Sequence, residues 1–204
     1  FRGIHGSWTT PWLDMLARAG YCVLAIDQYG FGERFVSRDD APGPPFLGGI
    51  KDLPEEVVCE ARDHTVQQVK DARRCLDYLA GRDEVDANRV ALMGQSLGAY
   101  NACLTAGLED RLAAAVLIVL GCWPAGSTTD PVLQVGHTMN FAPRISCPVL
   151  MVSATDDVGA TREEAQAVFA AFPTAKQIVW HESEHVILVE DQRPEINHWL
   201  EKTL

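Results

Sequence analysis

The stretch ALMGQSLGA, residues 91–99, places a serine hydroxyl between two glycines. An apolar run leads into Gly94, Ser96 follows two positions later, and Gly98 comes two positions after the serine. This G-x-S-x-G pattern is typical of a tight turn from a strand into a helix, where the serine projects outward as a nucleophile. Small residues at 94 and 98 let such a turn close, and the helix start favours negative charge beside the hydroxyl. The pattern therefore predicts a nucleophile at Ser96, although glycine and serine are common enough for it to arise by chance.

A serine hydroxyl becomes reactive when a neighbouring base takes its proton and a carboxylate orients that base. In proteins with this turn, the acid follows the serine along the chain and the histidine follows the acid. Asp156 and Asp157 both come directly after an apolar run, and one of them can equally be a turn or cap residue. His185 lies in a loop beyond the last apolar run, whereas His181 continues that run. We therefore predict His185 as the base and keep both aspartates as candidates for the acid.

The elements that must position these residues alternate along the chain. Strand-like apolar runs cover residues 20–27, 89–94, 112–121, 147–154 and 176–181, and helix-like segments cover residues 64–81, 96–108, 161–172 and 191–204. Strands separated by helices are typical of βαβ units and a mostly parallel sheet. The sequence therefore predicts the α/β class, with a central sheet flanked by helices. Ligands of such sheets gather at the carboxyl ends of the strands.

A single domain of residues 1–204 fits the length of the chain. Residues 35–61 interrupt its alternating pattern with four prolines and three glycines. We interpret this stretch as an irregular excursion with at most a short helical turn. A loop of this length is typical either of a functional lid or of a mobile connection.

Composition and charge exclude several classes of partner. The net charge is −11, from 17 basic and 28 acidic residues, which argues against a nucleic acid or an anionic membrane surface as partner. The six cysteines show no metal-ligand spacing, so we predict free thiols in a reducing compartment, a cytoplasmic location, and neither metal nor cofactor. The sequence shows no signal peptide and no apolar stretch long enough to span a membrane.

Four segments resemble the α/β-hydrolase superfamily, and within it the branch of dienelactone hydrolases and acetyl xylan esterases. They are AGYCVLAIDQYGFGER, DARRCLDYLAGRDEVDANRVALMGQSLGA, CPVLMVSATDDV and HESEHV, and they occur in the order of the family. The resemblance implies an α/β-hydrolase fold and a serine hydrolase with a small-molecule ester as its partner. It also favours Asp157 over Asp156 as the acid, and it matches His185 to the family's base.

The resemblance also implies two backbone N–H groups that bind the oxyanion. The Leu97 N–H, directly after the nucleophile, is one of them. The family's other donor follows a His-Gly pair, and the spacing fits a pair just before Phe1 better than it fits His5-Gly6. We therefore expect Phe1 to supply this donor, with Ser7 as the alternative, and we expect the chain to begin inside the fold, without the N-terminal strands.

Cys122 and Trp123 follow the strand-like run at 112–121. We predict that they line the substrate pocket, with a packing role as the alternative. The resulting hypothesis is a serine hydrolase that cleaves a small carboxylic ester. Thioesterase, lactone hydrolase and peptidase activity on the same three residues are alternatives within enzymes. A binding protein without catalysis is the alternative from another class, because a fold does not dictate a function.

Overall fold

A parallel four-stranded sheet forms the centre of the protein in a computed structural model, which describes residues 10–34, 55–124 and 131–204. The strands pair in the order β1-β2-β3-β4, and each neighbouring pair is parallel. They are β1 (Ala91–Gln95), β2 (Ala114–Ile118), β3 (Val149–Ala154) and β4 (Lys176–His181). The predicted α/β class is confirmed. All four strands begin and end close to their expected bounds.

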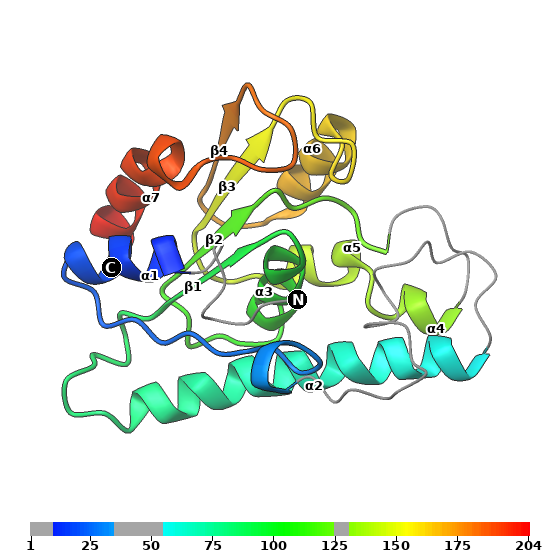
Figure 1. Cartoon of the computed structure of the whole chain (residues 1–204), viewed down its shortest axis with the longest axis horizontal. Helices are drawn as coiled ribbons and strands as arrows, with labels where there is room; N and C mark the ends of the chain where they lie inside the picture. The colour runs from blue at the N-terminus through cyan, green and yellow to red at the C-terminus, as the bar shows by residue number, and fades with distance from the viewer. Residues whose placement is uncertain (1–9, 35–54, 125–130) are drawn as a thin grey trace.

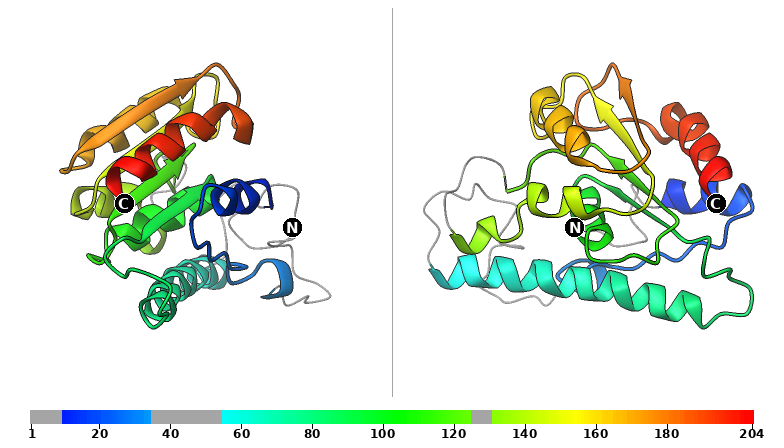
Figure 2. Two further views of the ribbon diagram at one scale, coloured as in Figure 1. Left: turned by 90° about the vertical axis from the view of Figure 1, so that its left-hand side faces the viewer. Right: turned by 180° about the vertical axis from the view of Figure 1, so that it is seen from behind.

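Helices cover both faces of the sheet (Figures 1 and 2). Helices α1 and α7 lie on one face, whereas α3, α5 and α6 lie on the other, with α2 packed outside α3. Their bounds are α1 (Thr10–Arg18), α2 (Glu55–Ala80), α3 (Leu97–Ala106), α4 (Pro131–Gln134), α5 (Thr138–Phe141), α6 (Arg162–Ala171) and α7 (Val189–Thr203). Short 3-10 helices cover Gly32–Arg34 and Ala142–Arg144. None of the helices in this part of the chain is long and apolar enough to cross a membrane.

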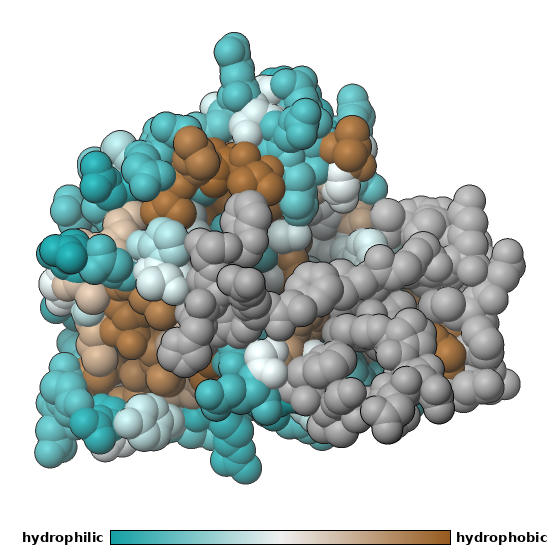
Figure 3. All heavy atoms as spheres, viewed as in Figure 1, coloured by the Kyte–Doolittle hydropathy of each residue, from teal (hydrophilic) through white to brown (hydrophobic). Residues whose placement is uncertain are grey.

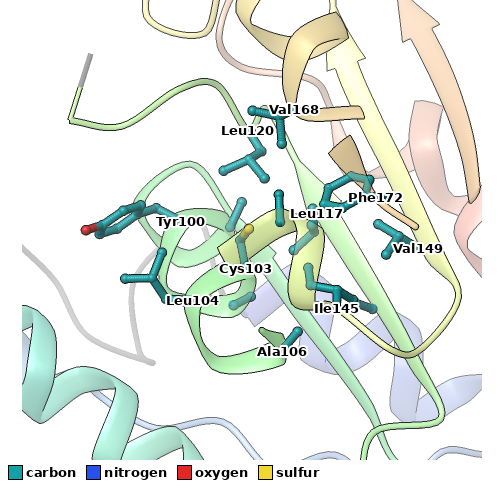
Figure 4. Packing of buried hydrophobic residues seen from close by; sticks show 14 of the residues in the cluster. Tyr100, Cys103, Leu104, Ala106, Leu117, Leu120, Ile145, Val149, Val168 and Phe172 are labelled. Carbon is teal, nitrogen blue, oxygen red and sulfur yellow. The ribbon is translucent and has the colours of Figure 1, made fainter. Parts of the chain in front are cut away.

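Alternate residues of the central strands feed two separate apolar cores, as the two-residue period of a strand requires. Leu117 and Met151 pack with residues of α3 and α6, and Figure 4 shows this core at close range. Ile118 and Val152 point the other way, toward Trp199 of α7 and residues of α1. Both central strands, β2 and β3, are buried along their whole length. This explains why their sequences are continuous apolar runs.

Two predicted elements differ from the structure. Residues 20–27, expected as a strand buried on both faces, form no strand among the described residues, and the side chains of Leu24 and Ile26 are 39% and 37% exposed. Apolar surface on the left of Figure 3 lies over α1 and the segment that follows it. The helix expected over 64–81 begins earlier, at Glu55, so residues 55–61 of the predicted excursion are helical. Residues 35–54 lie outside the described part of the chain.

The segment after residue 27 is tied to α2 and α3 by buried polar groups. The Asn101 amide nitrogen donates to Gln28 Oε1 at 3.0 Å and to Gln68 Oε1 at 2.9 Å. The Gln68 amide in turn donates to the Tyr29 carbonyl at 2.9 Å. Asn101 and Gln68 are both buried, so these bonds satisfy groups that would otherwise be costly inside the protein. The network fixes α3, whose first residue follows Ser96.

Candidate active site

Three polar side chains meet at the carboxyl end of the sheet. Ser96 Oγ lies 2.7 Å from His185 Nε2, and His185 Nδ1 lies 2.7 Å from Asp157 Oδ2. Ser96 directly follows β1, Asp157 follows β3, and His185 follows β4. The parallel sheet therefore brings Ser96 to His185, 89 positions away in the chain, and His185 to Asp157, 28 positions away. Serine, histidine and aspartate in this order of contact can move a proton from the hydroxyl to the imidazole.

The turn around Ser96 is held by close backbone contact. Ser96 has φ 54° and ψ −118°, a conformation that residues other than glycine rarely adopt. A Cβ on Gly94 would lie 2.1 Å from the Gly98 carbonyl oxygen, so only glycine fits at position 94. A Cβ on Gly98 would meet no atom of the described residues within 4 Å. The described residues therefore enforce the small residue expected at position 94, and none of them enforces the one expected at position 98.

The loop that carries Asp157 is held by hydrogen bonds. The carboxylate is buried, with 1% of its side chain exposed, and its Oδ1 accepts the Gly159 N–H at 2.7 Å and the Ala160 N–H at 3.0 Å. Oδ2 is left to contact the imidazole of His185. Asp156 is exposed instead, and its carboxylate accepts a bond from the Thr155 hydroxyl. The structure therefore brings Asp157, and not Asp156, to His185.

The imidazole of His185 stands between buried acid and open surface. Its side chain is 41% exposed, so part of the imidazole is open to solvent. Val158, next to Asp157, and Val186, next to His185, are 94% and 42% exposed, and the charged residue Glu184 beside His185 is exposed as well. His181 is the last residue of β4, and its backbone carbonyl accepts a hydrogen bond from Thr155.

Of the predicted oxyanion donors, only Leu97 lies among the described residues. Leu97 is the first residue of α3, where a backbone N–H has no partner within the helix and the helix dipole favours negative charge. Its position directly beside Ser96 fits the predicted role. Phe1, like the alternative Ser7, lies outside the described residues.

Cys122 and Trp123, predicted to line the substrate pocket, have separate surroundings. The Cys122 thiol is half-buried and lies 3.9 Å from the Glu164 carbonyl, and burial raises the pKa of this thiol. The backbone N–H of Trp123 donates to Thr138 Oγ1 at 2.9 Å, while the residue lines a cavity between α2, α3 and α4. Neither Ser96 nor His185 lines that cavity. A role for the two residues in substrate binding stays a prediction.

Two supports of the site were not predicted from the sequence. The indole N–H of Trp12 donates to Gln95 Oε1 at 3.2 Å, and this bond joins α1 to the residue before Ser96. The apolar spacing of Trp12 and Met15, after Thr10-Pro11, was a signal for α1. The second support is the pair of N–H groups of Gly159 and Ala160 that bind the Asp157 carboxylate. Backbone donors are present at every residue except proline, so no residue type in the sequence indicates them. Among the residues that the structure describes, no group of three or more His, Cys, Asp or Glu side chains is arranged to hold a metal ion.

Comparison with known proteins places this geometry in a family. The model of the alpha/beta hydrolase family matches residues 4–144. The chain belongs to this family. The matched part of this alpha/beta hydrolase includes the turn around Ser96, whereas Asp157 and His185 lie beyond it. Their assignment rests on the contacts described above.

Individual relatives are similar to the chain either in sequence or in structure. YtaP of Bacillus subtilis (strain 168), named a putative hydrolase, is 33% identical over 104 residues, which are 51% of this chain and 31% of YtaP. The chain thus spans about a third of the length of that relative. An acetyl xylan esterase from Paenibacillus sp. R4 has a TM-score of 0.72 at 22% identity, over 100% of this chain and 72% of the esterase. Acetyl Xylan Esterase 1 from Thermoanaerobacterium sp. JW/SL YS485 has a TM-score of 0.71 at 20% identity, over 98% and 72% of the two chains. The likeness to these two structures is one of fold.

Proposed function

We propose that this protein is a serine hydrolase that cleaves small carboxylic esters through an acyl-enzyme intermediate. The observation that carries the proposal is the pair of 2.7 Å contacts that joins Ser96 to His185 and His185 to Asp157. These distances are within hydrogen-bond reach for a nucleophile, its base and the group that orients the base. The strained backbone of Ser96 supports the proposal, because such strain is concentrated at functional sites.

In the first half of the reaction, Ser96 Oγ attacks the ester carbonyl while His185 Nε2 accepts the hydroxyl proton. Asp157 receives the Nδ1–H, so the imidazole keeps the tautomer in which Nε2 is free to accept. The N–H groups of Gly159 and Ala160 occupy the other carboxylate oxygen, and this leaves the aspartate one orientation toward the imidazole. The imidazolium that forms then lies beside a buried negative charge.

Collapse of the tetrahedral intermediate breaks the bond between the carbonyl carbon and the alcohol oxygen. His185 Nε2–H gives its proton to the leaving alcohol, and the acyl group stays on Ser96. The Leu97 N–H stabilises the negative oxygen, a contribution of about 3 kcal/mol for one such donor. Water then attacks the acyl-enzyme, with His185 again accepting a proton, and the carboxylic acid leaves with Ser96 restored.

The test is hydrolysis of p-nitrophenyl esters whose acyl chains run from acetate to palmitate. We expect turnover of the short esters, and we expect Ser96→Ala to lower kcat for them by at least 10³-fold without changing the melting temperature by more than a few degrees. A Ser153→Ala variant, which removes a buried serine hydroxyl from β3, is the matched control and should keep its turnover. The absence of turnover by the folded wild-type protein on every ester, or equal turnover by the wild type and Ser96→Ala, would contradict the proposal.

A further inference from the structure

A cavity of about 280 Å³ lies between α2, α3 and the described residues 123–124 and 131–141. Its volume is close to the lower end of the range for small-molecule sites, about 300–1,000 Å³. Three groups of side chains line it. They are Ala61, Arg62, Thr65, Val66, Val69, Lys70 and Arg73 from α2; Tyr100, Leu104 and Leu108 from α3 and its end; and Trp123, Pro124, Val132, Leu133, Val135, Gly136 and Phe141 from the third segment.

The base of the cavity is apolar and rigid. Val69, Tyr100 and Leu104 are 7%, 6% and 2% exposed, so they are fixed by packing against the rest of the fold. Figure 4 shows Tyr100 and Leu104 on the side of α3 that faces away from Phe172 and Val149. The Tyr100 hydroxyl donates to the Gly136 carbonyl at 2.9 Å, which ties the α3 wall to the opposite wall. A pre-formed apolar base of this kind suits a hydrocarbon chain or ring.

The rim of the cavity is cationic. Arg62, Lys70 and Arg73 are exposed residues on the face of α2 that lines the cavity, and no described lining residue is acidic. Arg62 is paired with Asp63, and Arg73 with Glu109. Lys70 forms no ion pair within the described part of the chain, so among the described residues it is the rim cation whose charge has no acidic partner. The whole protein has a net charge of −11, so a positive rim is unusual on its surface. The charge of Lys70 would attract a ligand with a single negative charge.

The cavity is separate from the triad. None of Ser96, Asp157 and His185 lines it. From Tyr100, one helical turn after Ser96, the lining on α3 continues through Leu104 to Leu108, away from the turn that holds the serine. A ligand in this cavity therefore does not need to displace a substrate at Ser96.

We propose that this cavity is a second binding site, which takes a carboxylate with a medium-length apolar tail. The tail lies against Val69, Tyr100 and Leu104, and the carboxylate stays at the rim beside Lys70. One negative charge balances the charge of Lys70, whereas a doubly charged phosphate would exceed it. The inference stands on the cavity alone and does not depend on the proposed ester hydrolysis.

Calorimetric titration of the full chain with decanoate, below its micellar concentration, tests the proposal. We expect saturable binding of one decanoate, weaker binding of decanol, and no binding of decyltrimethylammonium at the same concentrations. The affinity for decanoate should fall when the salt concentration is raised, because the rim charge is exposed. The proposal is overturned if decanoate does not bind, or if the cation or the alcohol binds as tightly as decanoate.

Substitutions then locate the ligand. Val66→Trp fills the cavity from α2, and Leu108→Trp fills it from the end of α3; both side chains are 44% exposed, so the larger ring can be accommodated without rebuilding the core. Either variant, once shown to be folded by its melting temperature, should weaken decanoate binding more than tenfold. Val158→Trp, at a 94% exposed position beside Asp157, is the matched control and should bind as the wild type does. If only Val158→Trp weakens binding, the ligand sits at the triad and the proposal is wrong.

The charge is tested by a matched pair of lysine variants. Lys70→Gln should weaken decanoate binding about two- to five-fold, as expected for an exposed charge pair. Lys202→Gln, on the exposed surface of α7, should leave binding unchanged. Equal effects of the two substitutions would show that the net charge of the protein acts, and that Lys70 has no specific role.

Discussion

The nucleophile turn, residues 94–98, and the acid loop, residues 155–160, are held in place by different forces. In the nucleophile turn, backbone packs so closely against backbone that position 94 has no room for a Cβ, and Ser96 keeps φ at 54°. In the acid loop, two N–H groups hold the Asp157 carboxylate, and none of residues 155–160 has a positive φ. One segment is positioned by steric exclusion, and the other by hydrogen bonds to a buried charge.

This difference determines which kind of substitution each segment tolerates. The nucleophile turn should be sensitive to an added methyl group and insensitive to the loss of a single hydrogen bond. The acid loop should be sensitive to replacement of a carboxylate oxygen by an NH₂ group of the same shape. The Asp157 carboxylate has three partners, the N–H groups of Gly159 and Ala160 and the imidazole of His185. The predictions below test this contrast in order of decreasing effect.

The largest effect is expected for Asp157→Asn. The amide oxygen can still accept the N–H groups of Gly159 and Ala160, which turns the amide NH₂ toward His185. Nδ1 then accepts a hydrogen bond from that NH₂ and carries no proton, so the single proton of the neutral imidazole sits on Nε2, which cannot take the proton of Ser96. We expect kcat for p-nitrophenyl acetate to fall by about 10³–10⁴-fold.

The control for this prediction is Asp156→Asn at the neighbouring, exposed position. It should keep kcat within about twofold, because the Asp156 carboxylate contacts Thr155 and not the imidazole. Similar losses in both variants would mean that the negative charge of the loop matters and that the orientation of the imidazole does not.

Gly94→Ala should have the next largest effect, and it acts on the fold. The added Cβ would lie 2.1 Å from the Gly98 carbonyl oxygen, so the backbone of the turn has to move. We expect the free energy of unfolding, measured with urea, to fall by about 3 kcal/mol or more. Unchanged stability with full activity would contradict the close approach of the two glycines.

Trp12→Phe tests the hydrogen bond that joins α1 to the nucleophile turn. The phenyl ring keeps most of the apolar contact but leaves Gln95 Oε1 without the indole donor. We expect a loss of about 0.5–1.5 kcal/mol of stability and a kcat within about tenfold of the wild type. A loss of activity as large as that of Asp157→Asn would show that hydrogen bonding, and not steric exclusion, positions Ser96.

Gly98→Ala should have the smallest effect. An added Cβ meets none of the described residues within 4 Å, and alanine is about 1 kcal/mol better than glycine inside a helix. We expect stability in urea to be unchanged or slightly higher, with activity retained. The contrast between Gly94→Ala and Gly98→Ala, two equal changes four residues apart, is the most direct comparison within the turn.

The sequence predicted those elements whose local pattern of apolar residues matches their burial in the fold. Strands β2 and β3 are buried on both faces, so their apolar runs were easily recognised. The rule that parallel strands gather reactive groups at their carboxyl ends then placed Ser96, Asp157 and His185 together. The helix-like segment expected from residue 161 likewise matches α6, and in the structure Thr161 caps this helix in a capping box with both bonds present.

Other features depend on partners that a local pattern does not identify. Residues 20–27 have the composition of a buried strand, yet they form no strand among the described residues. The prolines and glycines at 42–54 obscured the helical spacing that begins at Glu55. The cavity beside Tyr100 combines three distant segments, so only the folded chain could reveal it.

The most direct test of the central claim is covalent labelling with a fluorophosphonate, followed by mass spectrometry of the peptides. The proposed role of Ser96 predicts one adduct, on the peptide that contains Ser96, and no adduct in the Ser96→Ala variant. Labelling that persists in Ser96→Ala, or a folded wild-type protein that takes no label, would contradict it.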